Sequence, residues 1–183
     1  MQKPNAYDSV SAKQFSGSPT VAPGAYVFGI VKSEVTKSSN DNEMLVLYLD
    51  IAKGEYQGKF REMSDNVQRD CLLKHYRVTD TEGSLPYFKG DIKSIEESNQ
   101  GFVFNFDEKT LRGKLVGGML SEEEYEKRDG TIGTRLKIAF LCSVATAESG
   151  KIRIPKKKEI DISQKSHNIY DNKPPLDDDD LPF

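Results

Sequence analysis

The chain has 183 residues, of which 36% are hydrophobic and 30% are charged, and its formal net charge is −3. This composition suits one core of ordinary domain size, with a polar surplus left for loops and tails. No stretch approaches the roughly 20 consecutive apolar residues of a membrane span, and the first ten residues lack the apolar segment of a signal peptide. We therefore expect a cytoplasmic protein with no membrane partner.

The first part of the chain predicts a flexible segment followed by strands. Residues 1–23 are rich in Ser, Pro, Ala and Gln without a sustained period, which is typical of a flexible N-terminal extension. Residues 25–35 and 44–52 are β-rich runs on either side of an Asn/Asp/Ser cluster, a pattern that predicts an antiparallel pair. We expect a third strand over 55–63, with Gly58 as a bulge or bend.

The hydrophobic period then changes from that of a strand to that of a helix. Apolar residues at helical spacing predict one helix over 66–78 and a second over 86–99, which ends at an Asn-Gln-Gly sequence. The short aromatic run 102–106 precedes residues 107–113, where we expect a single helical turn.

Alternation returns over 114–146, which predicts two long strands joined by a hairpin whose strongest turn signal is Asp129-Gly130. Beyond Asp161 there is no periodicity, and we expect residues 161–183 to form a disordered acidic tail. Three strands, a helical insertion and two further strands favour a mainly β domain over 24–160. The pattern fits a small Greek-key barrel of the OB type, with a generic α+β sandwich as the alternative.

The sequence contains no phosphate-binding loop, dinucleotide fingerprint, zinc-protease motif or nucleophile elbow. We therefore expect no enzyme and no cofactor. Glu122, Glu123 and Glu124 could hold a metal in a nuclease, but the mixed charges that follow them are more typical of a solvated hairpin arm.

A zinc site is a second possibility for metal binding. Cys71 and His75 have the spacing of two ligands on one helical face, and Cys142 and His167 could complete the set. Since no Cys-x-x-Cys knuckle is present, we do not expect zinc.

Binding of single-stranded nucleic acid needs cations for phosphates and aromatic faces for bases. Strand alternation places Leu45, Leu47, Leu49 and Ile51 on a core face and leaves Tyr48 on the other face.

The same alternation sorts charged residues in the other expected strands. Lys59 and Arg61 lie opposite Phe60, and Arg135 and Lys137 lie opposite Leu136, Ile138 and Phe140. Tyr26, Phe28 and Lys32 fall on one face of the first strand. The predicted DNA-binding residues are Tyr48, Lys59, Arg61, Arg135 and Lys137, with Tyr26, Lys32, Tyr56 and Tyr125 as secondary candidates.

Charge is divided unevenly along the chain. Residues 161–183 carry six acids and two lysines, so this segment has a net charge of −4 and the remaining 160 residues have +1. The acidic segment ends in the sequence DDDDLPF, Asp177 to Phe183, in which an exposed apolar tip follows a run of aspartates.

This ending resembles the acidic C-terminal tip of bacterial and bacteriophage single-stranded DNA-binding proteins. GEYQGKF, KSIEESN and EEEYEKRDGTIGTR are similar to segments of small proteins from phage replication and recombination modules, so the body looks like a diverged phage type. The resemblance implies an OB domain that binds single-stranded DNA and forms a homo-oligomer in the cytoplasm of a bacterial host.

The resemblance also implies that the tip recruits replication, recombination or repair proteins. The partner-binding residues would then be Asp177, Asp178, Asp179, Asp180, Leu181, Pro182 and Phe183. Phe183 would enter an apolar pocket with its α-carboxylate beside a cation, and the aspartates would face a basic rim. Two alternatives remain open: an adaptor that uses the tail but binds no DNA, and a metal-dependent nuclease.

The charge division predicts that the acidic tail competes with DNA for the basic surface of the body. Deleting Asp177–Phe183 should tighten binding of single-stranded DNA several-fold at low salt, because the competing carboxylates are removed. A titration of full-length and truncated protein into a fluorescent oligo-dT measures this, and equal affinities would contradict it.

Overall fold

The structure is a computed structural model that describes residues 20–127 and 129–160. The predicted tail at 161–183, most of the predicted N-terminal extension and the DDDDLPF tip lie outside the described residues.

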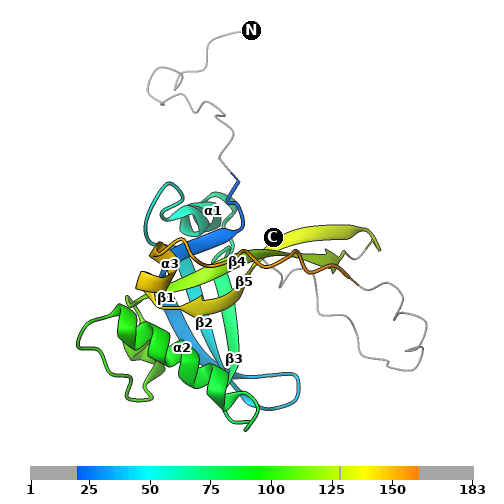
Figure 1. Cartoon of the computed structure of the whole chain (residues 1–183). Coiled ribbons are helices and arrows are strands. Elements are labelled where there is room, and N and C mark those ends of the chain that lie inside the picture. Colours follow the sequence, from blue (N-terminus) through cyan, green and yellow to red (C-terminus); the bar gives the residue numbers. More distant parts are fainter. Residues whose placement is uncertain (1–19, 128, 161–183) are drawn as a thin grey trace, which may run out of the picture.

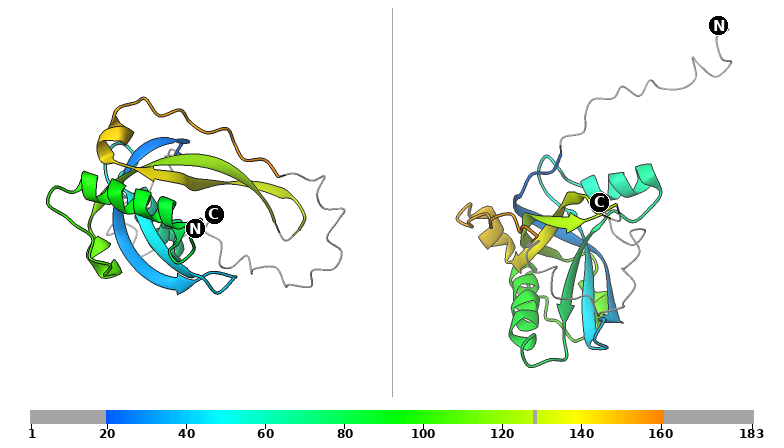
Figure 2. Two further views of the ribbon diagram at one scale, coloured as in Figure 1. Left: turned by 60° about the horizontal axis from the view of Figure 1, so that its bottom comes forward. Right: turned by 90° about the vertical axis from the view of Figure 1, so that its right-hand side faces the viewer.

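Five strands form one antiparallel sheet in the order β3-β2-β1-β4-β5. Their bounds are Gly24–Lys37 for β1, Glu43–Ile51 for β2, Leu73–Val78 for β3, Leu115–Glu126 for β4 and Ile132–Cys142 for β5. The sheet is strongly curved (Figures 1 and 2), and its two outer strands, β3 and β5, come into contact with each other. The prediction of a mainly β domain is confirmed.

In the described part of the chain, four helical segments accompany the sheet: α1 at Lys59–Val67, α2 at Leu85–Ser98, the 3-10 helix η1 at Glu108–Leu111 and α3 at Val144–Glu148. Figure 1 places α1 and α2 at opposite ends of the curved sheet. Within residues 20–127 and 129–160, none of the helices has the length and apolar character needed to cross a membrane.

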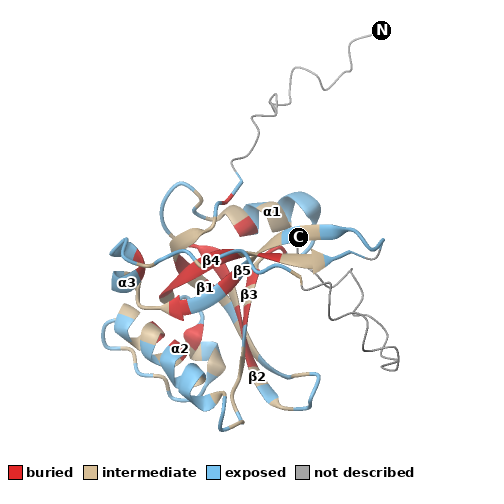
Figure 3. Ribbon diagram, turned by 45° about the vertical axis from the view of Figure 1, so that its right-hand side comes forward, coloured by how far each residue is buried: buried red, intermediate tan, exposed pale blue. Residues whose placement is uncertain are grey.

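The concave side of the sheet holds the core, shown in red along the strands in Figure 3. The predicted core face of β2 is confirmed, because Leu45, Leu47, Leu49 and Ile51 are each at most 3% exposed. Ile95 of α2 joins this core from one end of the sheet. Burying these side chains supplies about 25 cal/mol per Å² of apolar area, which is the main favourable term in folding.

The predicted third strand at 55–63 is wrong, because α1 begins at Lys59. Gly58 precedes the helix with φ of 72°, a left-handed conformation that glycine adopts without strain. A glycine has no side chain to cap the helix, and the buried Asp50 takes that part instead. Its carboxylate accepts the backbone N–H groups of Phe60 and Arg61 at 3.1 and 3.2 Å. A residue from β2 therefore satisfies the start of α1.

The predicted helix at 66–78 is also wrong. α1 ends where Gln68 adopts a left-handed conformation with φ of 52°, and the chain then enters β3 at Leu73. β3 pairs with β2, and this ladder buries Leu73 and His75 against the core. The long-range pairing outweighs the local helical spacing of the apolar residues.

The helix, the helical turn and the two strands predicted between 86 and 146 are confirmed. A helix occupies 85–98, a helical turn follows at 108–111, and two long strands flank the Asp129-Gly130 turn. One detail of β5 differs, since a register shift places Met119 opposite Phe140 but Leu120 opposite Ile138. The extra residue, Ala139, turns Phe140 outward to 36% exposure, so its predicted place on the core face is wrong.

Gly117 provides a test of the packing between α3 and β4. A Cβ atom at this position would lie 2.5 Å from the Ser143 carbonyl oxygen and 2.8 Å from Ala147 Cβ. We expect Gly117→Ala to lower the free energy of unfolding by about 1–3 kcal/mol, because backbone would have to move. Urea denaturation measures the change.

The matched control is Gly90→Ala on α2, where an added Cβ would meet nothing within 4 Å. This change should raise the free energy of unfolding by about 0.5–1 kcal/mol through helix propensity. Equal effects of the two substitutions would contradict the assigned packing.

Candidate nucleic-acid interface

The bulge in β1 decides which side chains face outward beside β2. Ile30 pairs with Leu49, but Lys32 pairs with Tyr48, so the register shifts at Val31. Ile30 is therefore buried, and Lys32 lies next to Tyr48 on the convex side. The prediction that Tyr26, Phe28 and Lys32 share one face is wrong, because the bulge reverses the alternation between Phe28 and Lys32.

Tyr48 lines an open hollow of about 510 Å³ on this convex side. The hollow, called the Tyr48 hollow below, is lined by Val31, Lys32, Tyr48, Asp70, Leu72 and Arg112. Its residues come from β1, β2, the segment before β3 and the segment before β4. The fold thus assembles one surface from four parts of the chain.

Two ammonium groups flank the ring of Tyr48. Lys32 Nζ lies 4.7 Å and Lys74 Nζ 5.3 Å from the ring centroid. The phenol donates a hydrogen bond to the carboxylate of Glu34. Burial and this hydrogen bond raise the pKa of Tyr48 above its usual value. The ring is consequently neutral and held in position, with cations beside it.

Carboxylates balance part of this positive charge. Glu34 pairs with Lys32, and Asp70 lies 3.6 Å from Lys74. Hydrogen bonds from Lys32 and from Tyr48 lower the pKa of Glu34, so this acid is ionised at neutral pH. Arg112 is exposed and has no carboxylate within ion-pair distance among the residues that the structure describes. The surface therefore keeps a small positive surplus.

Tyr76 extends the same surface along β3. It lies two residues beyond Lys74, and its side chain is 53% exposed. Burial raises the pKa of Tyr76 and the charge of Arg135 opposes that rise, which links β5 electrostatically to this part of β3.

Lys74, Tyr76 and Arg112 are functional candidates that the sequence prediction missed. Because 66–78 was predicted as a helix, Lys74 and Tyr76 were not placed on a strand face. Alternation with Leu73 and His75 is the signal that could have found them. Arg112 lies in a loop and carries no periodic signal.

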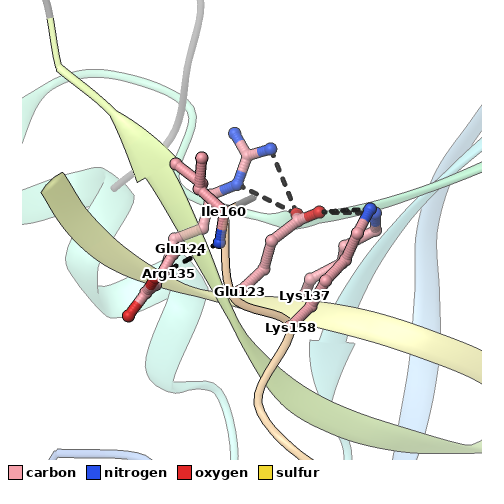
Figure 4. A network of polar contacts seen from close by, with 6 residues as sticks. All are labelled: Glu123, Glu124, Arg135, Lys137, Lys158 and Ile160. Atoms are coloured by element: carbon pink, nitrogen blue, oxygen red, sulfur yellow. Dashed lines mark hydrogen bonds and ion pairs between the residues drawn. The ribbon is translucent and has the colours of Figure 1, made fainter. Parts of the chain in front are cut away.

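The second candidate surface is the projecting arm of the β4–β5 hairpin. Glu123, only 8% exposed, pairs with Arg135 at 3.2 Å, Lys137 at 3.3 Å and Lys158 at 3.4 Å (Figure 4). Arg135 and Lys137 therefore share one face of β5, as predicted. Burial alone would raise the pKa of Glu123, but Lys137 and Arg135 outweigh it and hold the pKa below its usual value.

The segment 151–160 runs along this arm. Lys158 donates its N–H to the Glu122 carbonyl at 3.0 Å, and its own carbonyl accepts the N–H of Glu124 at 2.9 Å. Lys157 pairs with the Glu124 carboxylate at 2.7 Å. This group of contacts between Glu122–Glu124 and Lys157–Lys158 is called the clasp below, and it fixes the last described residues to β4.

Tyr125 packs across the hairpin onto Gly133. A Cβ at Gly133 would lie 2.8 Å from the tyrosine ring, so glycine leaves the space that the ring fills. The guanidinium of Arg135 lies 5.4 Å from the ring centroid. Tyr125, Arg135 and Lys137 thus gather on the arm.

The remaining predicted site residues lie outside the Tyr48 hollow and the arm. The rings of Tyr26 and Tyr56 meet edge to face, with 6.1 Å between their centroids, and both side chains pack against the core. Lys59 pairs with Glu62 at 3.2 Å, and Arg61 is exposed on α1. The structure therefore brings Lys32 to Tyr48 and gathers Tyr125, Arg135 and Lys137 on the arm. Tyr26, Tyr56, Lys59 and Arg61 lie elsewhere, in the region around α1.

The residues that were considered and rejected as zinc ligands do not have the helical spacing assumed for them. Cys71 precedes β3 and His75 lies within it, so they do not share a helical face, and His167 lies outside the described residues. His75 Nε2 instead contacts Asp91 at 2.9 Å, which together with Arg77 ties α2 to β3. Among residues 20–127 and 129–160, no cluster of three or more His, Cys, Asp or Glu side chains could hold a metal ion.

No family model matches the chain, and no curated protein matches it. The functional argument therefore depends on the residues of the chain itself.

The clasp should weaken in acid. Because the pKa of Glu123 is lowered in the folded state, its ion pairs stabilise the protein above the usual glutamate pKa, and the stabilisation is lost as pH falls through the folded value. Glu123→Gln should cost about 1 kcal/mol at pH 7 and progressively less in acid. Thermal unfolding at several pH values measures the difference.

Glu122→Gln is the matched control, because the Glu122 carboxylate makes no ion pair among the described residues. It should leave the unfolding midpoint close to wild type at each pH. A pH-independent loss in Glu123→Gln would contradict the role given to its charge.

Proposed function

We propose that this chain is a non-enzymatic, sequence-tolerant single-stranded DNA-binding protein built on an OB-type barrel. The observation that carries the proposal is the Tyr48 hollow, where Lys32 and Lys74 flank an aromatic ring on β2 and Arg112 lines the same hollow. Single-strand binding needs this combination of a stacking face and nearby cations.

The arrangement of the strands supports the choice of fold. The order β3-β2-β1-β4-β5, contact between the outer strands and a helix between β3 and β4 suit a five-stranded, partly open Greek-key barrel. In OB folds the face of strands 2 and 3 and the loop between strands 4 and 5 bind oligonucleotides. The Tyr48 hollow lies on the first of these regions, and the β4–β5 arm corresponds to the second.

In the proposed mechanism, lysines at the Tyr48 ring leave their positions in the free protein and pair with DNA phosphates. In the free protein, Lys32 and Lys74 lie over the Tyr48 ring and pair with Glu34 and Asp70. A base that stacks on the ring displaces an ammonium group, which moves to the adjacent phosphate. The ring accepts any base, because stacking uses the π face and not the hydrogen-bonding edge. Sequence tolerance follows.

The arm would contact the strand further along. Arg135 and Lys137 lie on one face and are held there by the buried Glu123. A phosphate approaching this face competes with Glu123 for the two cations. Binding at the arm should therefore be weak and sensitive to salt.

The C-terminal tip supplies the second half of the proposal. Leu181, Pro182 and Phe183 would enter an apolar pocket on replication, recombination or repair proteins, and Asp177–Asp180 would meet basic residues around it. Support comes from the resemblance of these seven residues to the tips of single-stranded DNA-binding proteins. We accordingly propose a phage-encoded homo-oligomer acting in the cytoplasm of a bacterial host.

One observation favours a second candidate, an adaptor that displays the tail but binds no DNA. Glu34 and Asp70 lie within the proposed binding surface and pair with its lysines. If these ion pairs persisted in the presence of DNA, the surface would attract phosphate only weakly.

Titration into a fluorescent oligo-dT at two salt concentrations distinguishes the candidates. The wild-type protein should bind at low salt and lose affinity as salt rises. Tyr48→Leu should weaken binding by about 5- to 100-fold, the range for losing one stacked base. Absence of salt-sensitive binding by the wild-type protein would refute the DNA-binding proposal and leave the adaptor.

Glu34→Gln gives the opposite effect in the same assay. The amide still accepts the Tyr48 hydroxyl but no longer neutralises Lys32, so binding at low salt should tighten by about three- to tenfold. Glu62→Gln, which removes the partner of Lys59 on α1, is the matched control and should change affinity less.

A further inference from the structure

An exposed aromatic residue lies in the loop between α2 and η1. The Phe106 side chain is 82% exposed and that of Val103 is 78% exposed, the highest values among the large apolar residues that the structure describes. Scattered apolar residues are common on protein surfaces, but two so fully exposed within four positions of one loop call for an explanation. Its neighbours Phe102 and Phe104 pack against the core.

The backbone at Phe106 has a strained conformation. Its φ is 64°, in the left-handed region that non-glycine residues rarely adopt, and an aromatic side chain has no local hydrogen bond to compensate. Selection for folding alone would favour Gly or Asn here. Strain of this kind in a native structure is a reason to look for a function.

The loop is held in place by its own hydrogen bonds. Glu96 of α2 accepts the N–H of Phe104 at 2.9 Å, and Asn105 Oδ1 accepts the N–H of Asp107 at 3.2 Å. Asp107 in turn accepts the N–H of Lys109 at 3.0 Å. The ring of Phe104 lies 5.4 Å from that of Phe106 and supports it from one side. Phe106 is thus a positioned ring on a fixed loop.

The loop leads directly to the border of the Tyr48 hollow. Gly113 donates to the Ile30 carbonyl at 2.8 Å, and Ser33 donates its hydroxyl to the Glu108 carbonyl at 2.7 Å. Residues 108–113 therefore follow the edge of β1 in the direction opposite to that strand. Phe106 lies two residues before Glu108, within about 8 Å of it along the chain. Glu108 itself contacts Ser33, the residue that follows Lys32 of the hollow.

Along the chain, Lys109 and Arg112 lie between Phe106 and the hollow. Lys109 and Arg112 are exposed, and neither has a carboxylate within ion-pair distance in residues 20–127 and 129–160. This distinguishes them from Lys32 and Lys74, which are paired. Such cations, on the segment that leads from Phe106 to the hollow, suit a phosphate backbone whose bases reach both rings.

We propose that Phe106 is a second base-stacking platform, so that a single strand runs from Tyr48 past Arg112 and Lys109 to Phe106, with Val103 as an apolar contact beside it. This inference rests on the proposed single-stranded DNA binding and extends its path along the β1 side. The occupant is an unpaired nucleobase of the same strand. A protein partner at this loop would leave DNA binding independent of Phe106.

The chain contains no tryptophan, which allows a direct measurement. Phe106→Trp introduces a single fluorescent reporter, and Tyr87→Trp on α2, another exposed aromatic at 63%, is its matched control. An oligo-dT of about 16 nucleotides should quench Trp at 106 and not at 87, whereas one of about 4 nucleotides should bind the Tyr48 hollow and quench neither. Equal quenching at both positions would overturn the assignment.

Phe106→Asn tests the same inference without the risk of unfolding. Asparagine suits the left-handed backbone, so the thermal midpoint should rise. Affinity for the 16-nucleotide strand should nevertheless fall about five- to tenfold, the lower range for one stacked base, while affinity for the 4-nucleotide strand stays unchanged.

The outcomes separate this inference from the proposed function. If the wild-type protein binds neither oligonucleotide, the proposed function and this inference both fail. If the wild type binds and Tyr48→Leu weakens binding, but Phe106→Asn binds both lengths like the wild type, only the second platform is refuted.

Discussion

Ile30 pairs with Leu49 and Lys32 pairs with Tyr48, although Leu49 and Tyr48 are consecutive and Ile30 and Lys32 are not. The extra residue, Val31, lets one strand contribute to the core before the bulge and to the convex surface after it. Without the bulge, strand alternation would put Ile30 and Lys32 on the same face. Either a lysine would be buried or an isoleucine exposed. The core and the candidate binding surface both depend on this register.

Four cations of the proposed interface, Lys32, Lys74, Arg135 and Lys137, pair with acids before any ligand arrives. Glu34 and Asp70 restrain the lysines at the Tyr48 ring, and Glu123 restrains the cations of the arm. Restraint lowers the conformational entropy that binding has to remove, but it also makes phosphate compete with a carboxylate. Such a surface favours binding that is readily reversed and depends on salt. Those properties agree with the proposed function, in which the protein leaves its strand when enzymes act on the DNA.

Two places in the fold keep a local conflict that long-range contacts resolve. The uncapped start of α1 is satisfied by Asp50 from β2, and the strained Phe106 is held by hydrogen bonds from α2 and from its own loop. At the start of α1 the missing cap is fully replaced, because the Asp50 carboxylate accepts the N–H groups of Phe60 and Arg61. At Phe106 the ring stays 82% exposed and contacts Phe104 on one side only, so burial does not offset the backbone strain and function is the better explanation there.

The sequence alone determined the elements whose signals are local. Alternation predicted β1 and β2, the Asp129-Gly130 turn predicted the β4–β5 hairpin, and helical spacing with an Asn-Gln-Gly ending predicted α2. It also determined the charge division that sets an acidic end against a slightly basic body.

Only the tertiary structure decided α1, β3 and the two bulges. α1 needs Asp50 of β2, and β3 forms by pairing with β2 in spite of its helical spacing. The bulges then chose Lys32 as the neighbour of Tyr48 and turned Phe140 outward. These features depend on residues far apart in the chain, and a single sequence carries no periodic signal for them.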